Sequence, residues 1–208
     1  MSLVSRVAAR RRAALIATAA LLVLTAVLGA YASRHGPLPG ERPLFDHPLH
    51  VPFGARQAAD AEQVLVGLGS PVVAVVLVLM LAAILLEAGE RAGALLVVLA
   101  SAVTAVAAAI KPLFGRHPLQ HLAPVAHYPS GHVAFVTAVL GMTGLLAGAR
   151  GRPVVAGCCA VPVLGIGPGV LIGGGHVASD VLGGYLLAAA WVLAILLGAA
   201  TSRRRRSA

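Results

Sequence analysis

Six apolar, nearly uncharged stretches dominate this chain of 208 residues. A helix needs about 20 mostly apolar residues to cross a hydrocarbon core roughly 30 Å thick, and each stretch has about that length. The stretches lie at residues 13–32, 64–86, 92–110, 131–149, 153–173 and 180–200. The sequence therefore predicts an all-α fold, a polytopic membrane bundle of six transmembrane helices.

The composition supports this prediction and excludes several other classes of protein. Apolar residues make up 59% of the chain and charged residues 11%, whereas soluble domains have roughly 25% charged residues. The net charge of +9 does not indicate a nucleic-acid partner, because aromatic residues make up only 4% and are not interleaved with basic ones. Cys158 and Cys159 are adjacent in an apolar run, which excludes a disulfide framework and a spaced zinc site.

The basic residues predict the orientation, because Lys and Arg are retained on the cytoplasmic face of a membrane. With six spans both termini lie on one side, and that side carries eleven basic residues: Arg6, Arg10, Arg11, Arg12, Arg91, Arg150, Arg152 and Arg203–Arg206. The opposite side carries five: Arg34, Arg42, Arg56, Lys111 and Arg116. We therefore expect a multi-pass protein of the cell membrane with both termini in the cytoplasm. The bias toward Ala and Arg is typical of high-GC bacterial genomes and indicates a bacterial inner membrane.

This layout divides the chain into three regions. Residues 1–63 hold a cytoplasmic tail, the first span and an outer loop, residues 64–200 form the membrane core, and residues 201–208 are a basic tail that we expect to contact membrane lipids. An alternative for residues 13–32 is a cleaved signal peptide, with small residues for cleavage at its end. We favour an uncleaved span, because a signal h-region has only 7–15 apolar residues.

The outer loop, residues 33–63, is rich in Pro, Gly, His and charged residues. Its histidines, His35, His47 and His50, raise the question of a metal site. They lack the i, i+4 spacing of a helical ligand pair, so we interpret the segment as a solvated loop.

Ionisable residues at the ends of spans gather on the predicted outer face, and such residues are usually functional in membrane proteins. Asp180 lies four residues after His176, a spacing that brings two side chains together on a helix. A carboxylate on one imidazole nitrogen fixes the tautomer and leaves the other nitrogen basic, as a nucleophile requires. The alternative is an ordinary ion pair at a helix end.

Two further segments carry polar residues on the same face. Residues 128–132 read as a turn that starts a helix, with Ser130 as its cap and Gly131 allowing close backbone approach. Amides at such a start bind phosphate, with His132 beside them, although an ordinary cap with an interfacial histidine fits equally well. Lys111 and Arg116 point their charge to the outer surface, and the alternative is that they snorkel.

Three motifs in this order resemble the type 2 phosphatidic acid phosphatase and haloperoxidase superfamily: Lys111-Pro-Leu-Phe-Gly-Arg116, Pro129-Ser-Gly-His132 and His176-Val-Ala-Ser-Asp180. The resemblance covers residues 64–200, and the family's membrane branch has six spans with a site on the outer face. It implies that His176 is the nucleophile, Asp180 orients it and His132 protonates the leaving alcohol. Lys111, Ser130 and Gly131 would bind the phosphoryl oxygens together with Arg116. The resemblance implies no metal and no cofactor.

The resemblance predicts an integral membrane phosphatase that hydrolyses a phosphate monoester or pyrophosphate of an amphiphile, with lipid phosphate as its partner. Two family arginines are absent from their usual places, which Pro118 and Val170 occupy. These departures support an alternative, a catalytically silent protein that binds or transports lipid phosphates or serves as a scaffold, whereas the retained His132, His176 and Asp180 favour the phosphatase. A third possibility, an ion channel or a proton-coupled carrier, would need charged residues in the middle of a span. The predicted spans have none there. The sequence makes no prediction of oligomeric state.

Overall fold

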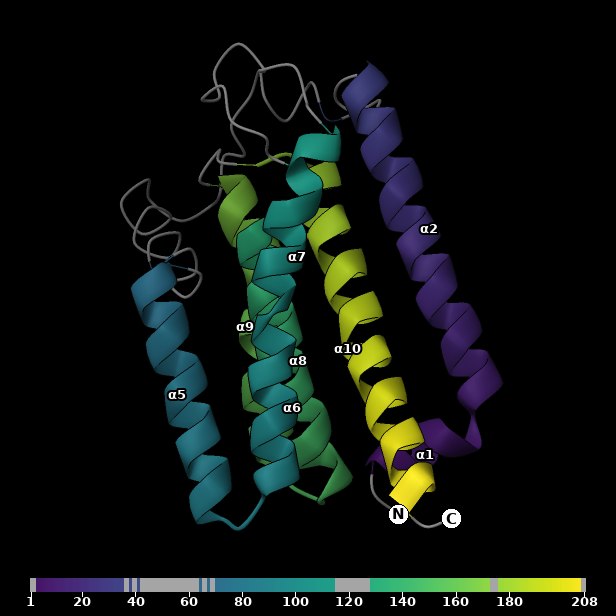
Figure 1. Cartoon of the computed structure of the whole chain (residues 1–208). Helices are drawn as coiled ribbons and strands as arrows, with labels where there is room; N and C mark the ends of the chain where they lie inside the picture. Colours follow the sequence, from purple (N-terminus) through teal and green to yellow (C-terminus); the bar gives the residue numbers. More distant parts are fainter. Residues whose placement is uncertain are drawn as a thin grey trace.

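The computed structural model describes residues 3–35, 38, 41, 64, 67, 70–114, 128–172 and 176–206. Its helices are α1 (Leu3–Ala9), α2 (Arg11–His35), α5 (Pro71–Glu87), α6 (Arg91–Ser101), α7 (Val103–Ile110), the 3-10 turn η1 (Lys111–Phe114), α8 (Gly131–Ala149), α9 (Pro153–Ile172) and α10 (Ala178–Arg206). The long helices run side by side, while α1 crosses one end of the bundle (Figure 1). Both termini lie at that end.

Five helical stretches in the described part of the chain are long and apolar enough to cross a membrane: Arg11–His35, Arg91–Phe114, Gly131–Ala149, Pro153–Leu171 and Ala178–Ser202. These confirm the predicted polytopic helical bundle. The stretch predicted at residues 64–86 contains α5, an apolar helix of 17 residues that is shorter than the other five. The count of six spans and the cytoplasmic position of the termini stay predictions.

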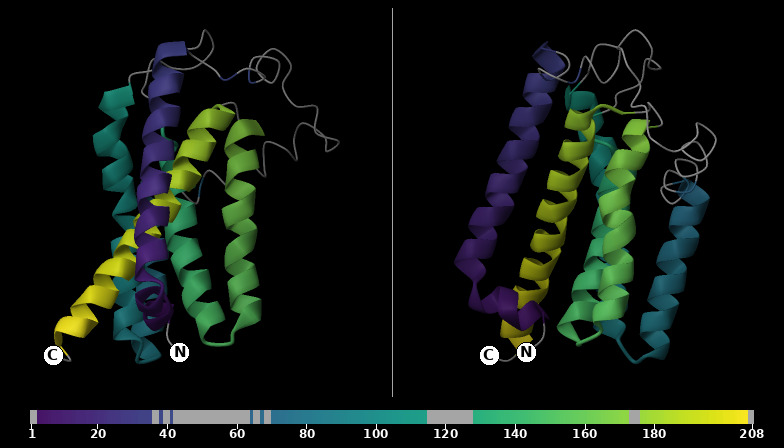
Figure 2. Two further views of the ribbon diagram at one scale, coloured as in Figure 1. Left: turned by 90° about the vertical axis from the view of Figure 1, so that its right-hand side faces the viewer. Right: turned by 180° about the vertical axis from the view of Figure 1, so that it is seen from behind.

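The core of the bundle is formed mainly by α8 and α10. Val133, Val136, Val139 and Met142 of α8 have no exposed surface, and Ala188 of α10 is equally buried. Helix α2 packs along α10, and α5 lies on the far side of the bundle (Figure 2). Both outlying helices expose large apolar side chains, as a hydrocarbon environment allows: Ile16, Val23, Val27, Val72, Val75 and Leu79.

The span most interrupted in the sequence forms one helix, α9, despite Pro162 and Pro168 within it. The Tyr185 hydroxyl of α10 accepts a hydrogen bond from the Gly167 amide at 3.1 Å and donates one to the Val163 carbonyl at 2.8 Å. These are the two groups that bond to each other in a regular α-helix. Tyr185 thus satisfies the α9 backbone beside its second proline.

Replacing Tyr185 with phenylalanine should destabilise the contact between α9 and α10. The change removes both hydrogen bonds and keeps the ring, and such bonds within membranes contribute roughly 0.6–1.7 kcal/mol each. We expect a lower apparent melting temperature in detergent. Tyr31→Phe is the control, because the Tyr31 side chain lies exposed on α2. An equal effect of the two substitutions would contradict this assignment.

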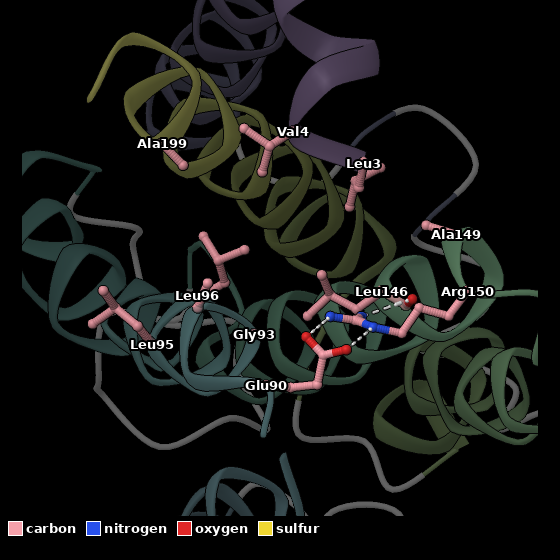
Figure 3. A pocket seen from close by; sticks show the side chains of 11 residues that line it. Leu3, Val4, Glu90, Gly93, Leu95, Leu96, Leu146, Ala149, Arg150 and Ala199 are labelled. Atoms are coloured by element: carbon pink, nitrogen blue, oxygen red, sulfur yellow. Dashed lines mark hydrogen bonds and ion pairs between the residues drawn. The ribbon is translucent and has the colours of Figure 1, made fainter. Parts of the chain in front are cut away.

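At the end of the bundle near the termini, Glu90 and Arg150 join the start of α6 to the end of α8. The Arg150 Nε donates to one Glu90 carboxylate oxygen at 2.7 Å and Nη2 donates to the other. Nη1 donates to the Leu146 carbonyl at 2.9 Å. The pair lines a cavity of about 330 Å³ whose other walls include Leu3 and Val4 of α1 (Figure 3). A bidentate pair of this kind fixes both distance and orientation between the helices.

The ion pair between Glu90 and Arg150 should stabilise the protein at neutral pH and lose this effect at acidic pH. The hydrogen bond from Arg150 holds the pKa of Glu90 below its ordinary value of 4.5. A carboxylate with a depressed pKa in the folded state stabilises the protein above its unfolded pKa and stops doing so as the pH falls through its folded pKa. Glu90→Gln should therefore lower the apparent melting temperature at pH 7, and the difference from the wild type should shrink below about pH 4.5. Glu87→Gln, at the exposed end of α5, is the control. A difference independent of pH would contradict this interpretation.

Candidate active site

Of the residues that the sequence singled out, Lys111, Ser130, Gly131, His132, His176 and Asp180 are described by the structure and lie at the end of the bundle opposite the termini. The end of α7 with η1, the start of α8 and the start of α10 all lie there (Figure 1). They bring together residues that are distant in the sequence.

His176 and Asp180 lie against each other, as their spacing predicts. The Nδ1 atom of His176 lies 3.5 Å from Oδ2 of Asp180. The side chain of His176 is 12% exposed and that of Asp180 is fully buried. The same Oδ2 accepts a hydrogen bond from the Val177 amide at 3.3 Å. A buried carboxylate at this distance can orient the imidazole.

The geometry differs from the expected one in one respect. His176 and Val177 precede α10, which begins at Ala178, so His176 does not share a helix face with Asp180. Asp180 is the third helical residue and bonds back to the amide that precedes the helix, as an acidic residue in a capping box does. Asp180 therefore caps α10 and also faces His176.

Ser130 caps α8, as predicted. Its backbone is extended, at φ −66° and ψ 116°, and its hydroxyl accepts a hydrogen bond from the Val133 amide at 3.5 Å. The Ser130 amide donates to the Asp180 carbonyl at 3.0 Å, which joins the starts of the two helices. This approach requires glycine at position 184, because a Cβ there would lie 2.8 Å from the Ser130 carbonyl oxygen.

The first two amides of α8 are open to a ligand. Within the described residues, neither the Gly131 amide nor the His132 amide donates a hydrogen bond. A Cβ built on Gly131 would meet nothing within 4 Å. Exposed amides at the start of a long helix attract anions. This arrangement can bind a phosphate group.

Three groups that can carry positive charge lie at this end of the bundle. Lys111 begins η1 and is half-buried, and His132 lies in the first turn of α8. The charges of both His176 and Lys111 act on His132. The structure thus brings Lys111, Ser130, Gly131, His132, His176 and Asp180 together. Arg116, Pro118, His47 and His50 lie outside the described residues.

Two further predicted positions lie in the described part of the chain. Val170, in the place of a family arginine, is an α9 residue that is only 3% exposed and packs in the apolar core. His35 ends α2, where its ring stacks on Tyr31 and its Nδ1 lies 3.3 Å from the Tyr31 carbonyl.

Tyr128 anchors the turn before α8, and it was not singled out from the sequence as a site residue. The side chain is fully buried, and its hydroxyl donates to the Thr25 carbonyl of α2. Its ring fits between Gly29 and Gly183, where a Cβ would lie 2.6 Å from ring atoms. Burial, with a smaller contribution from the Asp180 charge, raises the pKa of Tyr128, so the hydroxyl stays a donor. Tyr128 therefore fastens the turn before α8 to both α2 and α10.

Glu41 is the second residue that sequence reasoning missed. Its side chain is buried, and its carboxylate accepts hydrogen bonds from the amide and, at 3.4 Å, the hydroxyl of Ser179. The expectation that residues 33–63 form a solvated loop is therefore wrong at this position. A pattern within the segment could not indicate the contact, because its partner lies 138 residues away.

Comparison with known proteins bears on the fold of the chain. No family model and no curated protein matches the sequence. The structure is similar to the crystal structure of the first transmembrane PAP2 type phosphatidylglycerolphosphate phosphatase from Bacillus subtilis, with a TM-score of 0.69 and 16% sequence identity. The match covers 91% of this chain and 96% of the other. The resemblance drawn from the three motifs is thus confirmed at the level of architecture, because the chain shares the fold of this transmembrane PAP2 type phosphatase.

Proposed function

We propose that this chain is an integral membrane lipid-phosphate phosphatase. It hydrolyses a phosphate monoester or pyrophosphate of an amphiphile at the outer face of the membrane, without a metal, through a phosphohistidine. The observation that carries this proposal is that buried Asp180, which faces His176, accepts through its carbonyl a hydrogen bond from the Ser130 amide at the start of α8, where two amides are open. A nucleophile and an anion site thus adjoin each other.

In the proposed reaction, Asp180 faces Nδ1 of His176, so Nε2 attacks the phosphorus atom. The bond from phosphorus to the leaving oxygen breaks, and His132 donates a proton to that oxygen. Water then attacks the phosphohistidine and releases inorganic phosphate, with His132 taking the proton of the water. Phosphoryl transfer depends mainly on positioning and charge stabilisation, which the site residues supply.

Charge on the phosphoryl oxygens would be balanced by Lys111 and by the amides of Gly131 and His132. The Ser130 hydroxyl accepts from the Val133 amide, so its own hydrogen can be donated to the substrate. Arg116 is a further proposed ligand, carried over from the family motif.

The experiment is phosphate release by the detergent-purified protein from a panel of lipid phosphates. The panel contains phosphatidate, phosphatidylglycerol phosphate, a polyprenyl pyrophosphate and a polyprenyl sugar phosphate. We expect release from at least one, and no loss of activity after treatment with a chelator. No release from any substrate would contradict the proposal.

Buried Val170 favours a second candidate, a silent protein that binds or transports lipid phosphates, because it leaves α9 without the charge that the family motif carries there. Trapping of the enzyme intermediate separates the two functions. A radiolabelled, acid-labile phosphoenzyme supports the phosphatase. Tight binding of lipid phosphate without a phosphoenzyme or turnover supports the silent protein.

A further inference from the structure

Glu41 is the feature that the proposed reaction leaves unexplained. Glu41 is 5% exposed, and its carboxylate accepts hydrogen bonds from the Leu38 amide and from the amide and hydroxyl of Ser179. Burying a carboxylate is costly unless donors surround it. The first turn of a helix offers such donors, because its amides have no partner inside the helix. Glu41 is thus held by the start of α10.

The hydrogen bonds between Glu41 and Ser179 connect Glu41 to the proposed site. Ser179 is fully buried and immediately precedes Asp180, whose side chain faces His176. The Asp180 carbonyl in turn accepts the hydrogen bond from the Ser130 amide. One series of contacts therefore runs from Glu41 through the first turn of α10 to the start of α8. It passes both the nucleophile and the anion site.

We propose that Glu41 is a positioning residue for the reaction, which fixes the first turn of α10 and thereby the orientation of His176. This inference rests on the proposed function. It gives Glu41, a residue between the first two predicted spans, a part in the reaction, and Glu41 acts without touching the substrate. When Glu41 is replaced, Asp180 should still accept the hydrogen bond from the Val177 amide. We therefore expect His176 and Asp180 to stay paired, but with a looser geometry.

The test compares Glu41→Ala and Glu41→Gln with the wild type, using the best substrate of the panel. We expect Glu41→Ala to lower kcat by roughly 10- to 100-fold, as a small misplacement of reacting groups does, and to leave KM nearly unchanged. Glu41→Gln keeps an acceptor oxygen for Ser179 and should recover part of kcat. Glu87→Ala, which removes an exposed carboxylate from the end of α5, should leave kcat unchanged.

Hydrogen exchange supplies a readout that does not depend on activity. Peptides covering Ser179 should exchange faster in Glu41→Ala, while those covering α6 and the middle of α8 should not change. An unchanged kcat in Glu41→Ala beside an active wild type would overturn the role of Glu41 alone. So would a fall in kcat that only follows a loss of folded protein. Absence of phosphate release by the wild type would instead overturn the proposed function.

Discussion

His176→Ala is expected to reduce phosphate release by roughly 10⁴-fold or more, the scale seen when a nucleophile that acts with its partners is removed. The variant lacks the nitrogen that would bond to phosphorus, so no phosphoenzyme should accumulate. Asp180 should still accept the hydrogen bond from the Val177 amide, and the first amides of α8 should stay open. The fold and the proposed anion site should therefore persist. Initial rates and phosphoenzyme trapping measure the effect.

His35→Ala is the matched control for this substitution. His35 is an exposed histidine at the end of α2 that stacks on Tyr31 and plays no part in the proposed reaction. Its replacement should leave the rate unchanged. Binding of orthovanadate, a phosphate-like anion, should persist in His176→Ala. Equal rates for His176→Ala and the wild type would remove the proposed nucleophile.

Gly183→Ala should have the largest effect on stability. A Cβ at this position would lie 2.6 Å from Cζ and 2.8 Å from Oη of Tyr128. Neighbouring residues prevent the ring from shifting. Gly29 packs against it on the side of α2, and the ring of Phe114 lies edge-on to it, with 5.4 Å between the ring centroids. Overpacking of this kind costs about 1–3 kcal/mol. The displaced Tyr128 would also move the turn that begins α8, so activity should fall together with the melting temperature.

A second glycine of the same helix is the control for this prediction. A Cβ on Gly198 would meet nothing within 4 Å, and Gly198 lies in the exposed part of α10. Gly198→Ala should be neutral or slightly stabilising, since alanine is preferred to glycine within helices by about 1 kcal/mol. Thermal unfolding in detergent and phosphate release measure both variants. Similar melting temperatures for the two would contradict the proposed packing of Tyr128.

The helices were predictable because the membrane imposes a single requirement of length and apolarity. The stretches at residues 131–149 and 153–173 match α8 and α9 closely. The stretch at 64–86 begins before α5, which starts at Pro71 after the capping position Ser70. Apolarity extends past that point in the sequence, but proline at the first helical position defines the start of a helix.

The candidate site was predictable where function coincides with local structure. Ser130 and Gly131 lie at a helix start, and the interval from His176 to Asp180 is short, so motif and spacing point to the same residues. Glu41 and Tyr128 were not predictable, because their roles depend on contacts with Ser179 and Thr25, 138 and 103 residues away. Nothing in the local sequence distinguishes them from a loop carboxylate and an interfacial tyrosine.

The hydrogen bond between the Ser130 amide and the Asp180 carbonyl has a consequence for how the site tolerates change. Both atoms belong to the main chain, so every residue except proline at position 130 retains this link. The hydroxyl of Ser130 can therefore be varied independently of the connection between the two helices. In the proposed reaction, a substitution at this position would alter the affinity for phosphate, while the backbone link between the start of α8, which carries His132, and the start of α10 would stay in place.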